Sequence, residues 1–109
     1  MRYLMMSKAS DSENPADENL HIEMGRFIEE LTASGVLLAT GGLAPEGVVM
    51  TSVGDDITVT DGPFAEAREA VAGFALVEVR SKEEAVELAR RFRRIVGDGE
   101  SVIQQVFGP

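Results

Sequence analysis

The side chain best suited to chemistry is the carboxylate of Asp61. It opens the run Asp61-Gly62-Pro63-Phe64, which follows an alternating β-branched stretch at residues 57–60. An aspartate before Gly-Pro commonly accepts backbone N–H bonds in an Asx-turn, and proline fixes φ. Asp61 therefore has two compatible interpretations. It stabilises a rigid turn, or it is a carboxylate held at the mouth of a cleft as a general base or ligand acceptor.

His21 is the second candidate for catalysis and the only histidine in the chain. Imidazole changes its charge near neutral pH, so a proton shuttle between His21 and Asp61 would suit acid–base chemistry. The alternative is structural, because His21 directly follows Leu20, the first residue of an apolar helical stripe. A histidine at such a boundary is commonly half-buried and hydrogen-bonded.

Three other side chains are candidates for contacting a ligand. Phe64 is either a core anchor or a wall that faces the ligand. Arg68 lies between Glu66 and Glu69; it either joins a solvated charge cluster or holds a substrate carboxylate through two hydrogen bonds. Tyr3, the only tyrosine, belongs to an apolar strand. Its hydroxyl reaches the cleft, or the ring lies in the core or an interface.

The sequence predicts neither a metal nor a cofactor. One histidine and no cysteine leave scattered carboxylates without the spacing of a metal site. Gly41-Gly42 is followed by Pro45 rather than by a helix start, unlike a glycine-rich loop that binds phosphate. There is no Gly-x-Ser-x-Gly nucleophile motif. Whether the protein is an enzyme stays open; if it is, cofactor-free acid–base chemistry is expected.

Length and charge narrow the class of protein further. A chain of 109 residues predicts a single domain that spans residues 1–109. The net charge of −9 argues against nucleic-acid binding, which draws its affinity from basic groups. No apolar run approaches the roughly 18 residues that a membrane span requires, and no signal peptide is evident, so a cytoplasmic location is expected. Four arginines within residues 90–94 are interpreted as cations at a helix C-terminus, with an anion site as the alternative.

The first half of the chain predicts a strand, a helix and a hairpin. Residues 2–7 form an apolar strand. Asn14-Pro15 or Asp17 begins a helix that stops at Gly35. After an apolar run at residues 36–39, ended by Gly41-Gly42, residues 48–53 and 57–60 flank a Gly/Asp loop and read as a hairpin. The apolar stripe of the helix consists of Leu20, Met24, Phe27, Ile28 and Leu31.

The second half begins with the turn at residues 61–64. Residues 65–70 are expected to be an irregular or single-turn connection. Residues 73–80 are nearly all apolar and predict a central strand. Ser81 and Glu84 form a capping box for a second helix, and residues 101–107 form the last strand. The apolar stripe of this helix consists of Ala85, Leu88, Ala89, Phe92, Ile95 and Val96.

This order predicts an α+β protein with a ferredoxin-like βαββαβ fold, an inserted β-hairpin, and two helices on one face of an antiparallel sheet. Two helices cover only one face of such a sheet. The strand at residues 73–80 is apolar on both of its alternating faces, so its second face also needs cover. We therefore expect a homodimer that packs sheet to sheet.

The run from Thr60 to Glu66, followed by Gly73-Phe74 and an apolar strand, resembles the DGPF branch of the YCII-related proteins. The first strand, the helix that ends Phe27-Ile28-Glu29-Glu30-Leu31, the segment Gly42-Leu43-Ala44-Pro45 and the closing helix and strand are also similar. The resemblance covers nearly the whole chain. It implies the dimeric α/β-barrel version of the ferredoxin-like fold, with a cleft in each protomer.

The same resemblance implies two classes of function. The family has no established activity, but relatives carry a His–Asp pair in the cleft for which an enzymatic role has been suggested; the candidates here are Asp61 and the only histidine, His21. Relatives also occur near, or fused to, extracytoplasmic-function sigma factors, which implies a non-catalytic ligand-binding or regulatory module. The sequence therefore predicts a small homodimer with a cleft for a small organic ligand, and leaves both functions open.

Overall fold

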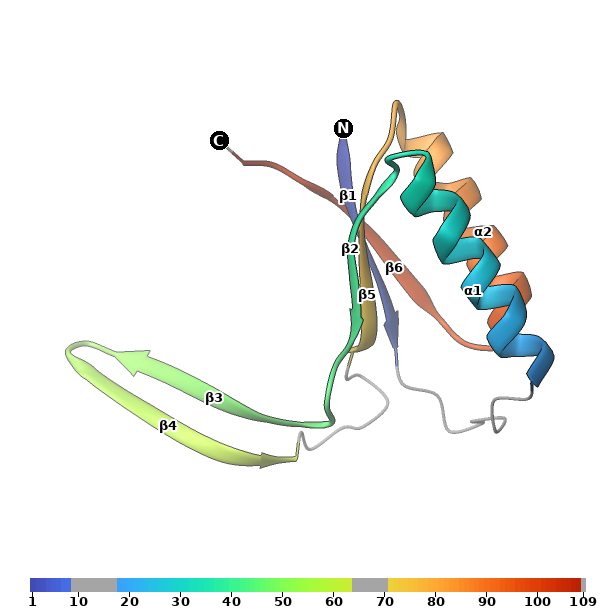
Figure 1. The fold of residues 1–109 in the computed structure, drawn as a ribbon. Helices are drawn as coiled ribbons and strands as arrows, with labels where there is room; N and C mark the ends of the chain where they lie inside the picture. The colour runs from blue at the N-terminus through green and yellow to red at the C-terminus, as the bar shows by residue number, and fades with distance from the viewer. Residues whose placement is uncertain (9–17, 64–70, 109) are drawn as a thin grey trace.

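The computed structural model describes residues 1–8, 18–63 and 71–108, which form two helices and six strands (Figure 1). The elements are β1 (Arg2–Lys8), α1 (Glu18–Ala33), β2 (Leu37–Gly42), β3 (Glu46–Val53), β4 (Asp56–Pro63), β5 (Val71–Glu78), α2 (Lys82–Val96) and β6 (Ser101–Val106).

Four strands form one antiparallel sheet in the order β2-β5-β1-β6, and β3 pairs with β4 in a separate two-stranded sheet. Both helices lie on the same face of the larger sheet (Figure 1). The prediction of a ferredoxin-like α+β fold with an inserted hairpin is confirmed, and β5 is a central strand as expected. The face of the sheet opposite the helices, here called the open face, is covered by no described element.

Helix α1 forms because its apolar residues recur at helical spacing and meet the sheet on one side. Phe27 and Leu31 are buried, and Met24 packs against them. Gly35, with φ of 77°, ends the helix at a conformation that glycine adopts without strain. The predicted caps at Asn14 and Asp17 lie outside the described residues.

Helix α2 begins and ends with side-chain contacts to the backbone. The Glu84 backbone N–H donates to the Ser81 hydroxyl oxygen over 3.2 Å, and the Arg80 N–H donates to the Glu84 carboxylate over 3.1 Å. At the other end the Arg93 guanidinium donates to the Gly97 carbonyl over 2.9 Å and to the Ser101 hydroxyl over 3.2 Å. Ser81 is therefore the N-cap as predicted, whereas the Glu84 carboxylate binds the N–H of Arg80, one residue before the position that a capping box uses. Arg93 acts as the predicted cation at a helix C-terminus.

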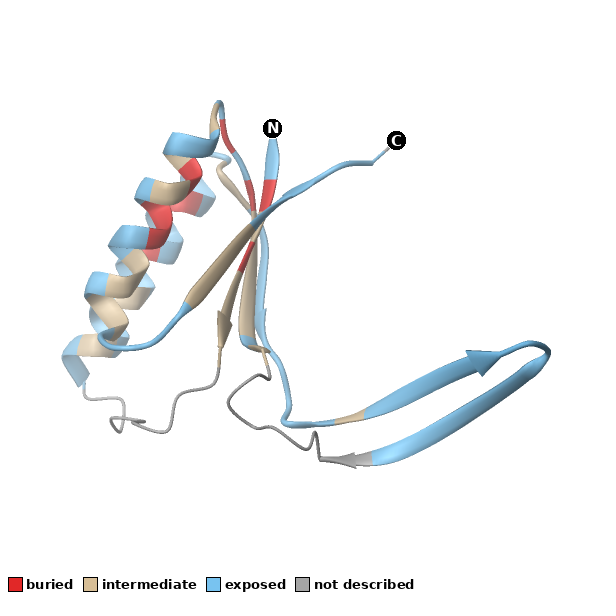
Figure 2. Cartoon of the chain, turned by 180° about the vertical axis from the view of Figure 1, so that it is seen from behind, coloured by how far each residue is buried: buried red, intermediate tan, exposed pale blue. Residues whose placement is uncertain are grey.

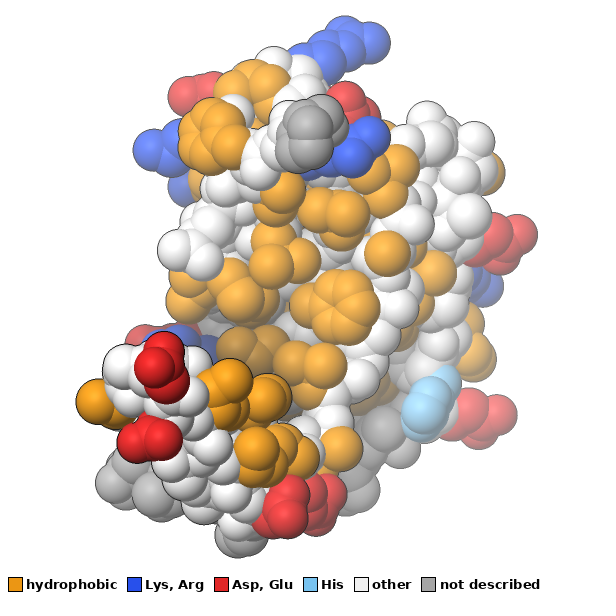
Figure 3. Space-filling model, turned by 90° about the vertical axis from the view of Figure 1, so that its left-hand side faces the viewer, with side chains coloured by type: hydrophobic (Ala, Val, Ile, Leu, Met, Phe, Trp, Pro, Cys, Tyr) orange, Lys and Arg blue, Asp and Glu red, His pale blue; other side chains and the backbone are white. Residues whose placement is uncertain are grey.

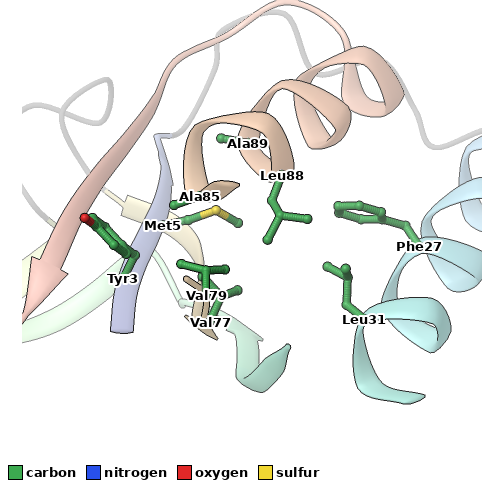
Figure 4. Close-up of a cluster of buried hydrophobic side chains, with 9 residues drawn as sticks. All are labelled: Tyr3, Met5, Phe27, Leu31, Val77, Val79, Ala85, Leu88 and Ala89. Atoms are coloured by element: carbon green, nitrogen blue, oxygen red, sulfur yellow. The ribbon is translucent and has the colours of Figure 1, made fainter. Parts of the chain in front are cut away.

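The core lies between the helices and the upper part of the sheet, and it is entirely hydrophobic (Figures 2 and 4). Val77 on β5 is fully buried. The other members of the core cluster come from the two helices, from β1 and from the residue that follows β5: Tyr3, Met5, Phe27, Leu31, Val79, Ala85, Leu88 and Ala89.

Strand β2 is longer than the sequence predicted. The apolar run was expected to end before Gly41-Gly42, yet both glycines pair with β5, where Gly41 faces Phe74 and Gly42 faces Gly73. A Cβ on Gly41 would come within 3.1 Å of the Phe74 ring. The glycine therefore permits close packing across the strands and does not mark a turn.

The predicted turn at Asp61 is a second correction, because β4 continues through Asp61 and Gly62 to Pro63. Asp61 pairs with Val48, Gly62 with Gly47 and Pro63 with Glu46. The strand prevails over the Asx-turn because β3 extends equally far and satisfies the backbone groups through ladder hydrogen bonds. Phe64 and the predicted connection at residues 65–70 lie outside the described residues.

Candidate functional site

The candidate site is a cavity of about 130 Å³ between the two helices and the sheet, next to the core. From the helices it is lined by Met24, Phe27, Ile28, Leu31, Ala89 and Phe92, and from the sheet by Met5, Ser7, Leu37, Thr40, Gly73, Ala75 and Ser101, with Gly41, Met6 and Phe74 also bordering it.

The cavity exists because the sheet residues under the helices become smaller along the strands. On β5 the positions on this face run from Val77 through Ala75 to Gly73. At the level of Gly73, Ser7 is its partner on β1, and Ser7 in turn pairs with Ser101 on β6. A row of three small residues thus crosses the sheet where the helices continue with large ones. The helical stripes fill the core at the Val77 end and leave the Gly73 end hollow.

The helical wall uses the same stripe that the sequence assigned to the core. Met24, Phe27, Ile28 and Leu31 stand at i, i+3, i+4 and i+7 of α1 and share one side of the helix. Phe27 and Leu31 are buried, whereas Ile28 is 37% exposed. Phe27 and Leu31 therefore belong to the core and also border the cavity, whereas Ile28 lies at its solvent-exposed edge.

Hydroxyl groups supply the polar edge of the cavity. The Thr40 hydroxyl donates to the Phe74 carbonyl over 2.9 Å, which leaves its oxygen able to accept a hydrogen bond. The Ser101 hydroxyl accepts from Arg93 over 3.2 Å and so is fixed in place. Ser7 faces Ser101 across the β1–β6 pair. The described lining residues carry no ionisable side chain, so the cavity suits an uncharged molecule with an apolar body and a polar edge.

Asp61 and His21 do not border this cavity. Asp61 is exposed on β4, and His21 is exposed on α1 rather than half-buried. Helix α1 packs on one side of the sheet, whereas the β3–β4 hairpin projects beyond the open face (Figure 1). The structure therefore does not bring the two predicted catalytic groups together within one protomer.

The three predicted ligand contacts have different outcomes. Tyr3 is 5% exposed and belongs to the hydrophobic core, as its structural interpretation predicted. Phe64 and Arg68 lie outside the described residues. None of the five candidates is among the described residues that line the cavity, so sequence reasoning missed the site, including its hydroxyl groups on Ser7, Thr40 and Ser101 and the small residues Gly73 and Ala75. A signal for them was present, since Gly73 and Ala75 are small residues at alternate positions of a strand predicted to be central.

An exposed ion pair links the two helices beside the cavity. The Arg91 guanidinium lies 2.6 Å from the Glu30 carboxylate and 4.8 Å above the ring centre of Phe27. The hydrogen bond from Arg91 lowers the pKa of Glu30, and the same bond raises the pKa of Arg91. Because Phe27 lines the cavity, this pairing fixes one wall of the site. Within the described ranges, no group of acidic or histidine side chains is arranged to hold a metal ion.

Comparison with known proteins gives three findings. The model of the YCII-related domain matches residues 1–104. An uncharacterised protein from Rhizobium meliloti (strain 1021) is 34% identical over 77 residues, which cover 68% of this chain and 61% of that protein. The match thus spans less than two-thirds of the relative.

The third finding is a structural similarity. The 5-chloro-2-hydroxyhydroquinone dehydrochlorinase of Burkholderia phenoliruptrix AC1100, solved with 2,5-dihydroxybenzoquinone, superposes with a TM-score of 0.52. The superposition covers 100% of this chain and 96% of that one at 12% sequence identity. At this identity the comparison supports the fold. No helix among the described residues is long and apolar enough to cross a membrane.

Proposed function

Because this chain belongs to the YCII-related domain family, we propose that it is a homodimeric ligand-binding domain whose cavity takes an uncharged organic molecule of about one ring. The observation that carries this proposal is the apolar cavity beneath α1 and α2, floored by Ser7, Gly73 and Ser101. A mainly hydrophobic lining with a few hydroxyl groups is the usual composition of a small-molecule site.

The volume of the cavity supports a ligand that consists of a single ring. At about 130 Å³ it is close to the roughly 150 Å³ of an engineered apolar cavity that binds benzene. Thr40 and Ser101 offer hydroxyl oxygens to a phenol or a similar polar substituent. The dehydrochlorinase of similar fold was solved with a dihydroxybenzoquinone, which is also a one-ring molecule with polar substituents.

The homodimer is supported by the open face of the sheet. By strand alternation this face carries Leu4 and Met6 on β1, Phe74 and Leu76 on β5, and Val102 on β6. Hydrophobic side chains gather over this face in Figure 3. A second copy that packs sheet to sheet would remove them from water.

Catalysis is a second candidate, favoured by the fold that the chain shares with a dehydrochlorinase. In this form Asp61 would act as a general base, with His21 as its proton partner. Since the two residues are apart in one protomer, the pair would have to form between subunits. Control of an extracytoplasmic-function sigma factor is a third candidate, and it rests on the family resemblance alone.

Binding is tested with a panel of uncharged one-ring phenols and quinones, measured by thermal shift. A ligand at about 100 times its dissociation constant adds roughly 2.7 kcal/mol to the unfolding free energy, so it raises the melting temperature. Ala75→Leu fills the cavity and should abolish this increase. The control, Ala72→Leu, changes an exposed residue of the same strand and should leave it intact. If no compound stabilises the wild type, or if Ala75→Leu responds equally, the cavity is not the site.

Asp61→Asn separates binding from catalysis. The substitution should leave the binding of the same panel unchanged, because Asp61 does not border the cavity. If the wild type converts a bound phenol and Asp61→Asn does not, the protein is an enzyme that depends on Asp61. Loss of binding in Asp61→Asn would instead contradict the cavity proposal.

A further inference from the structure

The hairpin formed by β3 and β4, here called the arm, has one hydrophobic face. The register pairs Val48 with Asp61, Met50 with Val59 and Ser52 with Ile57, so these residues share a face. Val48, Met50, Ile57 and Val59 are between 56% and 65% exposed. The opposite face carries the exposed valines Val49 and Val53, but it is richer in hydroxyls, since it also carries Thr60 and the cross-strand pair of Thr51 and Thr58.

Nothing described in the protomer covers the arm. Residues 48–61 are all exposed, and the arm stands away from the body of the molecule (Figures 1 and 2). A two-stranded hairpin is at best marginally stable in water unless a hydrophobic face packs against something. Six of the thirteen exposed large hydrophobic residues of the described chain lie on this arm, so it is the strongest candidate for a docking surface.

We propose that the hydrophobic face of the arm packs against a second copy of this chain, as a clamp that completes the dimer. This inference rests on the sheet-to-sheet dimer of the proposed function. Hydrophobic side chains run from the open face of the sheet onto the arm in Figure 3. One partner surface can therefore cover both, and a two-fold axis would present the arm of each protomer to the other.

The dimensions of the arm fit this role. Eight residues of β3 give it a length of about 27 Å, which exceeds the roughly 19 Å width of a four-stranded sheet. In flat area the open face offers roughly 390 Å² and one face of the arm roughly 260 Å². One face of the arm therefore adds roughly two-thirds to the flat area that the open face by itself offers to a partner.

The arm also carries Asp61. This residue shares the hydrophobic face and stands at its root, opposite Val48. Docking of the arm would therefore carry the Asp61 carboxylate to the dimer interface. Asp61 of one protomer would then lie against the other protomer. This is the arrangement that the catalytic candidate requires, in which Asp61 and His21 pair between subunits.

The test uses two variants that change the two faces of the arm in the same way. Met50→Lys with Val59→Glu places opposite charges on a cross-strand pair of the hydrophobic face, and Thr51→Lys with Thr58→Glu does so on the other face. Opposite charges keep each pair compatible with the hairpin, and neither variant alters the net charge of −9. We expect sedimentation equilibrium to show that the first variant has a dimer dissociation constant raised at least tenfold, and that the second stays dimeric.

A dimer that survives Met50→Lys/Val59→Glu, or one that both variants weaken equally, overturns the clamp and leaves the sheet-to-sheet dimer standing. A monomeric wild type overturns both. Neither result bears on the cavity, which the thermal-shift panel tests separately. Circular dichroism shows whether each variant is folded.

Crosslinking identifies what the arm touches. The chain has no cysteine, so Val59→Cys can be labelled with a benzophenone at one position. Irradiation should give a covalent dimer from this variant and much less from Thr58→Cys, whose label lies on the other face. Crosslinks confined to the same chain would show that the arm folds back, which overturns the clamp.

Discussion

Arg91 contacts two residues of the opposite helix, Glu30 and Phe27. Because Phe27 lines the cavity, Arg91 joins an ion pair to the cavity wall. Its guanidinium binds Glu30 at 2.6 Å and covers the ring of Phe27 at 4.8 Å. The hydrogen bond is the main cause of the lowered pKa of Glu30. A carboxylate whose pKa is lowered by folding stabilises the folded state as long as it is ionised.

Glu30→Gln should therefore lower the melting temperature at neutral pH. The pKa of Glu30 in the folded state lies below its ordinary value of 4.5, so its contribution is complete above that value and is lost as the pH falls through the folded pKa. The difference between variant and wild type should shrink below pH 4.5 and then vanish. Thermal unfolding at neutral and acidic pH measures it. The control is Glu29→Gln, at the exposed residue next to Glu30. An equal fall in melting temperature in this variant would mean that the charge of the helix, and not the ion pair with Arg91, causes the effect.

Among the elements, α2 is the one whose boundaries follow most directly from its own sequence. Ser81 and Glu84 each hold a backbone N–H at its start, and Arg93 holds carbonyls beyond its end. These contacts join residues a few positions apart. Local chemistry therefore determines where the helix begins and ends.

Ser81→Ala should lower the unfolding free energy by about 1 kcal/mol, because the Glu84 N–H loses its acceptor. Chemical denaturation monitored by circular dichroism measures the loss. Ser81→Asp retains a capping oxygen and should recover most of it. Equal destabilisation by both substitutions would mean that packing rather than capping determines the effect.

The strands show the opposite case. The extension of β2 through Gly41-Gly42 depends on β5, which is remote in sequence, and that of β4 to Pro63 depends on continued pairing with its hairpin partner β3. The residues at these positions are typical of turns when considered locally. Pairing with β5 and β3 respectively outweighs that preference, so the sequence predicted the hairpin correctly but placed its end too early.

The whole molecule is a sheet with two hydrophobic faces, and neighbouring residues of β5 distinguish them. Val77 lies beneath the helices and is fully buried. Leu76 alternates onto the open face, which no described element covers. The homodimer proposed above would therefore bury the opposite side of this strand from the side that the core buries.

Val77→Ala should cost about 2 kcal/mol of unfolding free energy through lost packing, whatever the protein concentration. Leu76→Ala should instead act on association, so that its melting temperature depends more steeply on concentration than that of the wild type. Thermal unfolding over a hundredfold range of concentration compares the two. If Leu76→Ala lowers stability by the same amount at every concentration, the open face does not mediate dimerisation.

The sequence by itself determined the elements of this protein and its family. Apolar residues at helical spacing in α1 and α2, the cap at Ser81 and the alternating hairpin strands are local patterns, and local patterns are legible in one chain. The tertiary structure decided the site. The cavity depends on Ser7, Gly73 and Ser101 meeting across three strands, and the separation of Asp61 from His21 depends on where the arm leaves the sheet. Both are relations between segments remote in sequence, which no local pattern records.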